Sequence, residues 1–179
     1  MNNQTMSRRS FIASSFAGVA VAASPKPERR FNTHSDAIAE AWRLVENDGC
    51  CRVIVRGCEI VLTERGRGTG PFLRLLDSRP ESLDGATVVD SVVGTASAAV
   101  AVKGRVAEVL ARTASEGAKD VLARAGIPLE AKVVVPRILN RDMSGPCPLE
   151  AGVAGIAGAD DILLAARQTL DGLRTQSIA

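Results

Sequence analysis

From Ser35 onward the sequence alternates short β-branched runs with amphipathic segments of helical period, and this order restricts the chain to a few α/β architectures. The expected elements are, in order, helix, strand, strand, helix, strand, helix, strand and helix. The first two strand runs are close enough to pair as a tight hairpin. We therefore predict an α/β fold, a three-layer α-β-α sandwich with a mixed sheet and no internal repeat.

The first predicted helix spans 35–48, because Ile38, Ala41, Trp42 and Val45 recur at helical spacing and Asn-Asp-Gly follows. The two β-rich runs after it are expected to turn at Arg56–Gly57. The other expected elements are a short helical turn and loop over 71–86, an almost entirely apolar buried helix over 88–102, a strand over 104–113, a serine-capped helix over 115–126, a strand over 127–139 and an amphipathic helix over 159–173.

The N-terminal segment has the features of an export signal. Paired Arg8 and Arg9 stand within SRRSFI, an apolar run begins at Phe11, and small residues permit cleavage after Ala22 or Ala23. The run is too short to anchor in a bilayer. It resembles a twin-arginine signal, so we expect export to the periplasm or medium, with membrane contact only through this signal; the alternative is a polar tail with a chance arginine pair. The predicted organisation is a signal peptide over 1–23, a linker over 24–34 and a domain over 35–179.

The composition argues against nucleic acid as a partner. The formal net charge is only +2, and the 22 basic residues are scattered rather than gathered in one stretch. Aromatic residues make up 3% of the chain and tyrosine is absent, which leaves few side chains for stacking on bases. We therefore predict no nucleic-acid binding, and leave self-association into a homo-oligomer open.

Four sequence blocks carry a resemblance to a known family. They are RGTGPFLRLL, DSVVGTASA, TASEGA and VPRILNRDMSGPCPLE, which occur in this order. Together they resemble a small uncharacterised prokaryotic family, a domain of unknown function, over about Asp36–Asp171. The resemblance implies a cytidine deaminase-like fold, and it supplies no established reaction.

A zinc-dependent deaminase needs a His or Cys with a Glu two residues later, and a further Cys pair. In this fold the first ligand lies at the start of the buried helix, where the chain has Asp90-Ser91-Val92. The Cys pair belongs at the start of the following helix, where the chain has Ser115–Ala118. Neither place holds a thiol or imidazole, so we predict no zinc and no other cofactor.

The remaining metal-ligating residue types are poorly grouped. Cys50 and Cys51 are neighbours on a predicted strand, so their side chains point to opposite faces. Cys58 is expected opposite Val55, away from both, and all three are interpreted as small hydrophobic residues of the sheet. The single histidine, His34, lies in or beside the linker. No metal site is predicted.

Cys147 and Glu150 form the most distinctive local pattern. Pro148 suits the first turn of a helix, and Glu150 stands at capping-box spacing from Cys147, so a structural cap is one interpretation. Alternatively, a helix N-terminus lowers the pKa of the Cys147 thiol and makes it a nucleophile or redox group, with Glu150 beside it. The third interpretation is ligand binding without chemistry.

Other polar residues in the blocks are candidate ligands for an anion. Asn140 and Arg141 follow a strand end and offer an amide and a guanidinium group that together suit an anion. Arg67 and Gly68 belong to a glycine-rich loop, which is either a plain surface loop or a loop whose backbone amides bind an anion. Helix starts at the rim of an α/β sheet also favour anions, and there the chain has Asp90, Ser115 and Glu116, each of which also serves as an ordinary cap or first-turn acid.

Three functions are consistent with these residues. The first is a zinc-free, deaminase-like domain that binds an anionic or nucleotide-like small molecule through Arg67, Gly68, Asp90, Ser115, Glu116, Asn140 and Arg141. The second is a periplasmic structural or partner-binding domain. The third is a thiol-dependent enzyme that uses Cys147.

Overall fold

The computed structural model describes residues 28–140 and 142–176, and the predicted export signal lies outside them. In chain order the elements are β1 (Arg29–Arg30), α1 (His34–Asn47), β2 (Arg52–Arg56), β3 (Glu59–Glu64), α2 (Thr69–Ser78), the short 3-10 helix η1 (Pro80–Ser82), β4 (Thr87–Val93), α3 (Thr95–Lys103), β5 (Glu108–Ser115), α4 (Glu116–Arg124), β6 (Leu129–Val135), α5 (Pro148–Gly152) and α6 (Ala159–Gln176).

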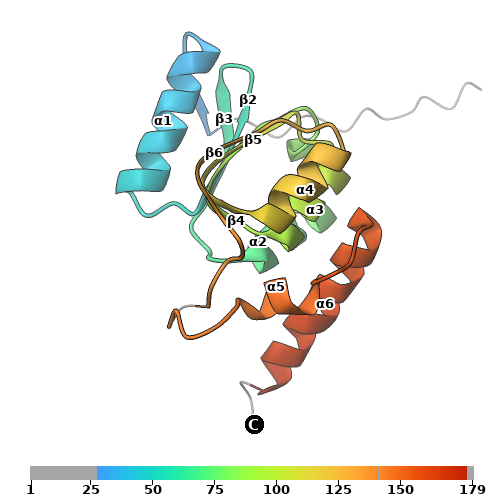
Figure 1. Cartoon of the computed structure of the whole chain (residues 1–179). Coiled ribbons are helices and arrows are strands. Elements are labelled where there is room, and N and C mark those ends of the chain that lie inside the picture. The colour runs from blue at the N-terminus through green and yellow to red at the C-terminus, as the bar shows by residue number, and fades with distance from the viewer. Residues whose placement is uncertain (1–27, 141, 177–179) are drawn as a thin grey trace, which may run out of the picture.

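The strands form one mixed sheet in the order β1-β3-β2-β4-β5-β6 (Figure 1). β2 pairs antiparallel with both β3 and β4, whereas β4, β5 and β6 run parallel, as crossover helices require. Helix α1 covers one face of the sheet; α2, α3 and α4 cover the other, with α6 packed along α3. The fold is therefore the predicted three-layer α/β sandwich.

Each face of the sheet has its own apolar core. Along β2, Ile54 packs into the larger core on the α3 side, whereas Val53 and Val55 pack into the smaller core under α1. This alternation follows from the two-residue period of a strand, and β-branched side chains suit it. Every residue from Thr95 to Ala101 of α3 is buried, so α3 is the central helix of the domain.

The buried helix predicted over 88–102 is wrong in its first half. Residues 88–93 belong to β4, and the chain turns at Gly94 into α3. A continuous apolar run has no period that distinguishes a buried strand from a buried helix. The difference lies in side-chain type, because the valines of the first half favour a strand and the alanines of the second half favour a helix.

Residues predicted to be linker contribute to the fold. Arg29 and Arg30 form the edge strand β1, which pairs with β3, and α1 begins at His34. Thr33 caps this helix in a reciprocal capping box with Asp36, so the helix begins before the predicted start at Ser35. The helical turn expected over 71–86 is a full helix, α2, followed by η1.

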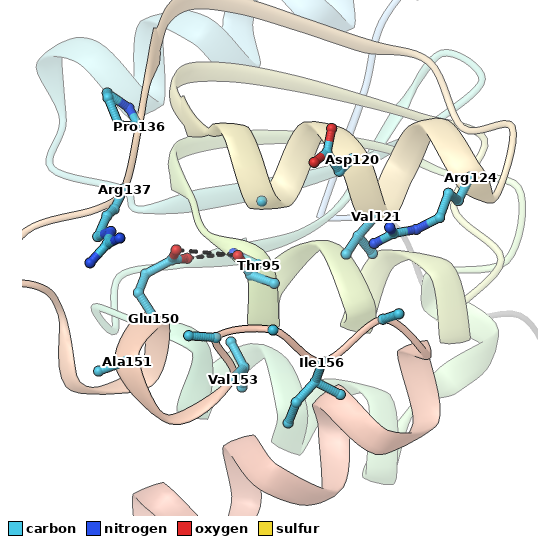
Figure 2. A pocket seen from close by; sticks show the side chains of 14 residues that line it. Thr95, Asp120, Val121, Arg124, Pro136, Arg137, Glu150, Ala151, Val153 and Ile156 are labelled. Atoms are coloured by element: carbon cyan, nitrogen blue, oxygen red, sulfur yellow. Dashed lines mark hydrogen bonds between the residues drawn. The ribbon is translucent and has the colours of Figure 1, made fainter.

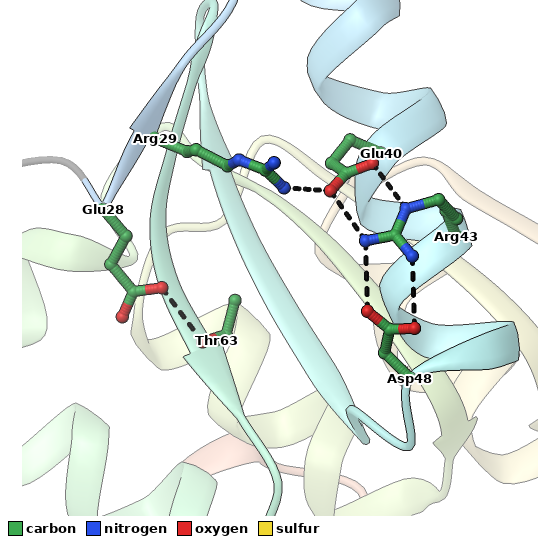
Figure 3. A network of polar contacts seen from close by, with 6 residues as sticks. All are labelled: Glu28, Arg29, Glu40, Arg43, Asp48 and Thr63. Atoms are coloured by element: carbon green, nitrogen blue, oxygen red, sulfur yellow. Dashed lines mark hydrogen bonds and ion pairs between the residues drawn. The ribbon is translucent and has the colours of Figure 1, made fainter.

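A surface network of charged side chains ties β1 to α1 (Figure 3). Glu40 accepts from both Arg29 and Arg43, and Arg43 also pairs with Asp48 at the end of the helix. The hydrogen bond from Arg43 holds the pKa of Glu40 below its usual value. The two arginines and Asp48 are exposed, so the network contributes to orientation more than to stability.

The hairpin turn and its cysteines differ slightly from expectation. Arg56 pairs with Glu59, so the turn is Gly57–Cys58, and Ile60 rather than Cys58 lies opposite Val55. All four cysteines are free thiols. No helix in the described part of the chain is long and apolar enough to cross a membrane.

Candidate functional site

The candidate site lies where two parallel strands end and two helices begin. β4 leads through Gly94 into α3, and β5 leads through Ser115 into α4. Helices α3 and α4 pack together, so their N-termini lie side by side at the carboxyl edge of the sheet. This edge is where open α/β sheets place ligands.

Two glycines allow the close approach at this point. A Cβ atom on Gly117 would overlap Thr95 Oγ1, and one on Gly94 would overlap the carboxylate of Glu150. Both positions therefore need a residue without a side chain. These glycines come from separate sequence blocks, DSVVGTASA and TASEGA, and Glu150 comes from a third.

The Glu150 carboxylate joins the two helix starts. Its Oε1 accepts from the Thr95 amide at 2.6 Å, and its Oε2 accepts from Thr95 Oγ1 at 3.2 Å. Ser115 Oγ donates to Oε1 at 3.3 Å. A negative charge at a helix N-terminus is favourable, because it faces unpaired amides and the positive end of the helix dipole.

Ser115 is the N-cap of α4, as predicted. Its fully buried hydroxyl accepts from the Ala118 amide at 3.1 Å while it donates to Glu150. Ser115, predicted from its position before a helix, and Glu150, predicted from the Cys-Pro-x-Glu turn, thus lie in one polar cluster. Thr95 completes this cluster and was not predicted from the sequence.

A cleft of about 310 Å³ opens beside this cluster. It lies between α4 and the segment 151–157, and Figure 2 shows Thr95 and Glu150 on its wall. Val121, Val153 and Ile156 give it an apolar side. Its volume is near the lower end of about 300–1,000 Å³ that small-molecule sites occupy.

Two arginines line this cleft, Arg137 just after β6 and Arg124 in the last turn of α4. Figure 2 shows them at opposite ends of the cleft, with Asp120 above it. Both arginines are exposed, and neither has an ion-pair partner among residues 28–140 and 142–176. Neither arginine was predicted from the sequence, although Arg137 lies within the block VPRILNRDMSGPCPLE.

Asp90 is placed differently from the expectation. It lies within β4 rather than at a helix start, and its carboxylate pairs with Arg52 at 2.6 Å, with side-chain exposures of 3% and 2%. Its other oxygen accepts from the Val92 amide at 3.0 Å. Arg52 also stacks over the Phe72 ring, 4.0 Å from its centroid. Asp90 does not line the cleft, and it anchors β4 to β2.

The capping box predicted between Cys147 and Glu150 does not form. The Cys147 amide donates to the Ile138 carbonyl at 2.9 Å, and the Glu150 side chain reaches Thr95 instead. Pro148 does open a short helix, as predicted. The Cys147 thiol is partly buried against the main core and does not line the cleft.

Asn140 organises its own loop. Its Oδ1 accepts from the Ser144 amide at 3.0 Å and the Gly145 amide at 3.4 Å, and its Nδ2 donates to Ser144 Oγ at 3.0 Å. These bonds occupy the amide that was expected to contact an anion. Arg141 lies outside the described residues, so its predicted contact with an anion stays a prediction.

Three further candidates do not line the cleft: Arg67, Gly68 and Glu116. Arg67 is exposed, and Gly68, with a φ of +82°, turns the chain into α2. Glu116 is an exposed first-turn acid of α4, 3.7 Å from Lys119. The described residues contain no group of three or more His, Cys, Asp or Glu side chains that could hold a metal ion.

The fold and the site define a three-layer α/β domain in which one carboxylate links two helix N-termini. A family model described as "TM1506: Domain of unknown function (DUF1893)" matches residues 40–170, and the chain belongs to this family. This confirms the family resemblance that was drawn from the four sequence blocks.

One solved structure similar to this chain is the crystal structure of a DUF1893 family protein, TM1506, from Thermotoga maritima at 2.70 Å resolution. It has a TM-score of 0.68 and 20% sequence identity, over 78% of this chain and 94% of that chain. At this identity the likeness shows the fold alone. A comparison with curated proteins finds no match.

Proposed function

We propose that this domain binds an elongated anionic small molecule, of the nucleotide or sugar phosphate class, in the cleft between α4 and the segment 151–157. The observation that carries the proposal is the pair Arg124 and Arg137. Both line the cleft, and neither is neutralised by an ion pair within the described residues. Guanidinium groups suit phosphate and carboxylate because they offer two parallel donors.

The rest of the cleft fits such a ligand. Val121, Val153 and Ile156 offer apolar contacts to a base or sugar, while the arginines at the two ends set the orientation of the charged groups. Asp120 at the rim excludes molecules that are negative along their whole length. A ligand meets these constraints if its anionic end lies beside one arginine and its neutral body lies between the two arginines.

Glu150 limits where the anion can lie. Its carboxylate already occupies the N-terminus of α3, so the ligand's negative group belongs beside an arginine and away from Thr95. Glu150 can still accept a hydrogen bond from a hydroxyl or amine of the ligand. We infer a binding role in which Glu150 orients the neutral part.

The scaffold proposed for this site is a deaminase-like fold without zinc. In that fold the metal ligands come from the starts of the helices that follow two parallel strands, and the corresponding residues here are Gly94, Thr95, Ser115 and Gly117. The hydroxyls among them already bond to Glu150, and none of these residues is a thiol or an imidazole. The proposal therefore needs no metal and no hydrolytic step.

A thermal-shift screen tests the proposed function. Inorganic phosphate, nucleoside monophosphates and sugar phosphates are the probes, and at least one should raise the melting temperature of the wild-type chain. Arg137→Ala and Arg124→Ala should each remove most of that shift, whereas Arg112→Ala should retain it. Arg112 is a matched control, since it is exposed on β5 and alternates onto the sheet face that α1 covers. No shift with any probe, or equal loss in all three variants, would contradict the proposal.

Export by the twin-arginine route is a second proposal, supported by the SRRSFI motif and the apolar run after it. A chain that folds before export can carry a ligand loaded in the cytoplasm, which suits a binding domain. Replacing Arg8 and Arg9 by lysine should leave the protein in the cytoplasmic fraction with its signal uncleaved. Unchanged fractionation of that variant would reject the route.

A further inference from the structure

The last strand of the sheet has one free side. β6 pairs with β5 and ends the strand order, and no described strand lies beyond it. Its amides and carbonyls on that side are therefore available to another strand. Val133 and Val134 are 51% and 41% exposed, and because they are consecutive they point to opposite faces of this edge.

From these features we propose that β6 is a self-association edge, on which two copies of the chain pair their β6 strands antiparallel around a two-fold axis. This proposal is independent of the ligand-binding cleft. A two-fold axis perpendicular to the sheet keeps each face of the sheet on the same side, so residues directly opposite each other must share a face. Two opposed residues are therefore an even number of positions apart in the sequence, and the axis passes through the residue midway between them. Each possible register is thus named by the β6 residue on the axis.

The charges on β6 select one of these registers. Glu130 and Lys132 are both exposed and lie on the same face of the strand, the face over which Lys132 reaches Glu46 and the Trp42 ring of α1. With Ala131 on the axis, each Glu130 lies opposite the other copy's Lys132, which gives two attractive cross-strand pairs.

The neighbouring registers are disfavoured by the same side chains. An axis at Glu130 or at Lys132 would place like charges directly opposite each other, which is destabilising. In the selected register Leu129 lies opposite the other copy's Val133 and covers its exposed side chain. Both the charge pairs and the apolar contact therefore favour the register with Ala131 on the axis.

Charge-reversal variants of the full chain test this pairing. Sedimentation analysis of the wild type should show a monomer–dimer equilibrium. Glu130→Lys alone and Lys132→Glu alone should each weaken dimerisation by about tenfold or more, since each creates two like-charge pairs. Lys119→Glu, an exposed charge change on α4, is the control and should leave the equilibrium unchanged.

The decisive arm mixes the two weakened variants, one of them isotope-labelled. In the mixed dimer the lysine introduced into one chain faces the glutamate introduced into the other. The unchanged Lys132 of the first chain likewise faces the unchanged Glu130 of the second, so native mass spectrometry should show the heterodimer restored. A fold defect in either variant cannot produce this rescue. A wild-type chain that stays monomeric, or a mixture that associates no better than either variant alone, would overturn the proposal.

Discussion

Replacing Glu150 by alanine tests whether one carboxylate holds the two helix starts together. The change removes three hydrogen bonds, to the Thr95 amide at 2.6 Å, the Thr95 hydroxyl at 3.2 Å and the Ser115 hydroxyl at 3.3 Å. The site opens to the cleft, so water replaces part of the loss. Ser115 also keeps its bond to the Ala118 amide. The short, charge-assisted bond to the Thr95 amide therefore dominates.

Hydrogen bonds to charged groups contribute about 1.5–3 kcal/mol, and a charge at a helix N-terminus adds about 0.3–1 kcal/mol. We expect Glu150→Ala to lower the free energy of unfolding by about 2–3 kcal/mol, or the melting temperature by about 5–10 °C. Glu150→Gln keeps an acceptor but loses the charge, and should cost about 1 kcal/mol.

Urea denaturation measures these changes as shifts of the midpoint at constant m-value. Glu116→Ala is the matched control, because Glu116 is also acidic and near a helix start but is exposed and makes only a 3.7 Å pair with Lys119. Its expected cost is below about 0.5 kcal/mol. If Glu150→Ala costs no more than Glu116→Ala, Glu150 does not link the helices.

Three other predictions concern groups outside this contact. Asp90→Ala should lower the free energy of unfolding in urea melts by about 3–5 kcal/mol, because it leaves Arg52 buried and unpaired. An Arg52→Met/Asp90→Leu double variant should recover much of that stability. If Asp90→Ala costs no more than an ordinary surface substitution, this prediction is refuted. Gly117→Ala should cost about 1–3 kcal/mol by overpacking against Thr95, and a neutral result would mean that the helices can separate there. Burial raises the pKa of the Cys50 thiol, so its alkylation at about pH 8 should be much slower in the native than in the urea-unfolded chain; equal rates would contradict its burial.

Elements with a clear period and local caps were predictable from the sequence. The final helix, expected over 159–173, is Ala159–Gln176, and the serine-capped helix expected over 115–126 is Glu116–Arg124. The apolar stripe of each helix and the residues that flank it are enough to predict where the helix begins and ends. The junction of β4 and α3 was not predictable in this way, since its mostly apolar residues show no period; only Gly94 and the change from valines to alanines mark it.

Some residues of the site could be predicted from the sequence, but the contacts between them could not. Ser115 and Glu150 were both candidates, but the spacing of Glu150 from Cys147 pointed to a local cap, whereas its partner Thr95 lies 55 residues away. Asn140 likewise satisfies its own loop instead of facing outward. Long-range pairing of this kind depends on which helix starts the sheet brings together, and local spacing does not encode it.

The arginines of the cleft show the same limit. In the sequence Arg124 is an ordinary last-turn residue that favours a helix end, and Arg137 stands near the more conspicuous Asn140 and Arg141. Their significance depends on a shared cleft that forms only when α4, the segment after β6 and the segment 151–157 come together. A single sequence gives no signal for that shared position.

The ligand-binding proposal is tested most directly by a heteronuclear NMR titration of the isotope-labelled protein with nucleoside monophosphates and sugar phosphates. The cleft predicts that amide shifts concentrate at Gly117, Arg124, Arg137 and the segment 151–157, with β1 and α1 unaffected. The same titration of Arg137→Ala should lose these shifts. Shifts that concentrate away from the cleft, or that persist in Arg137→Ala, would contradict the proposed site.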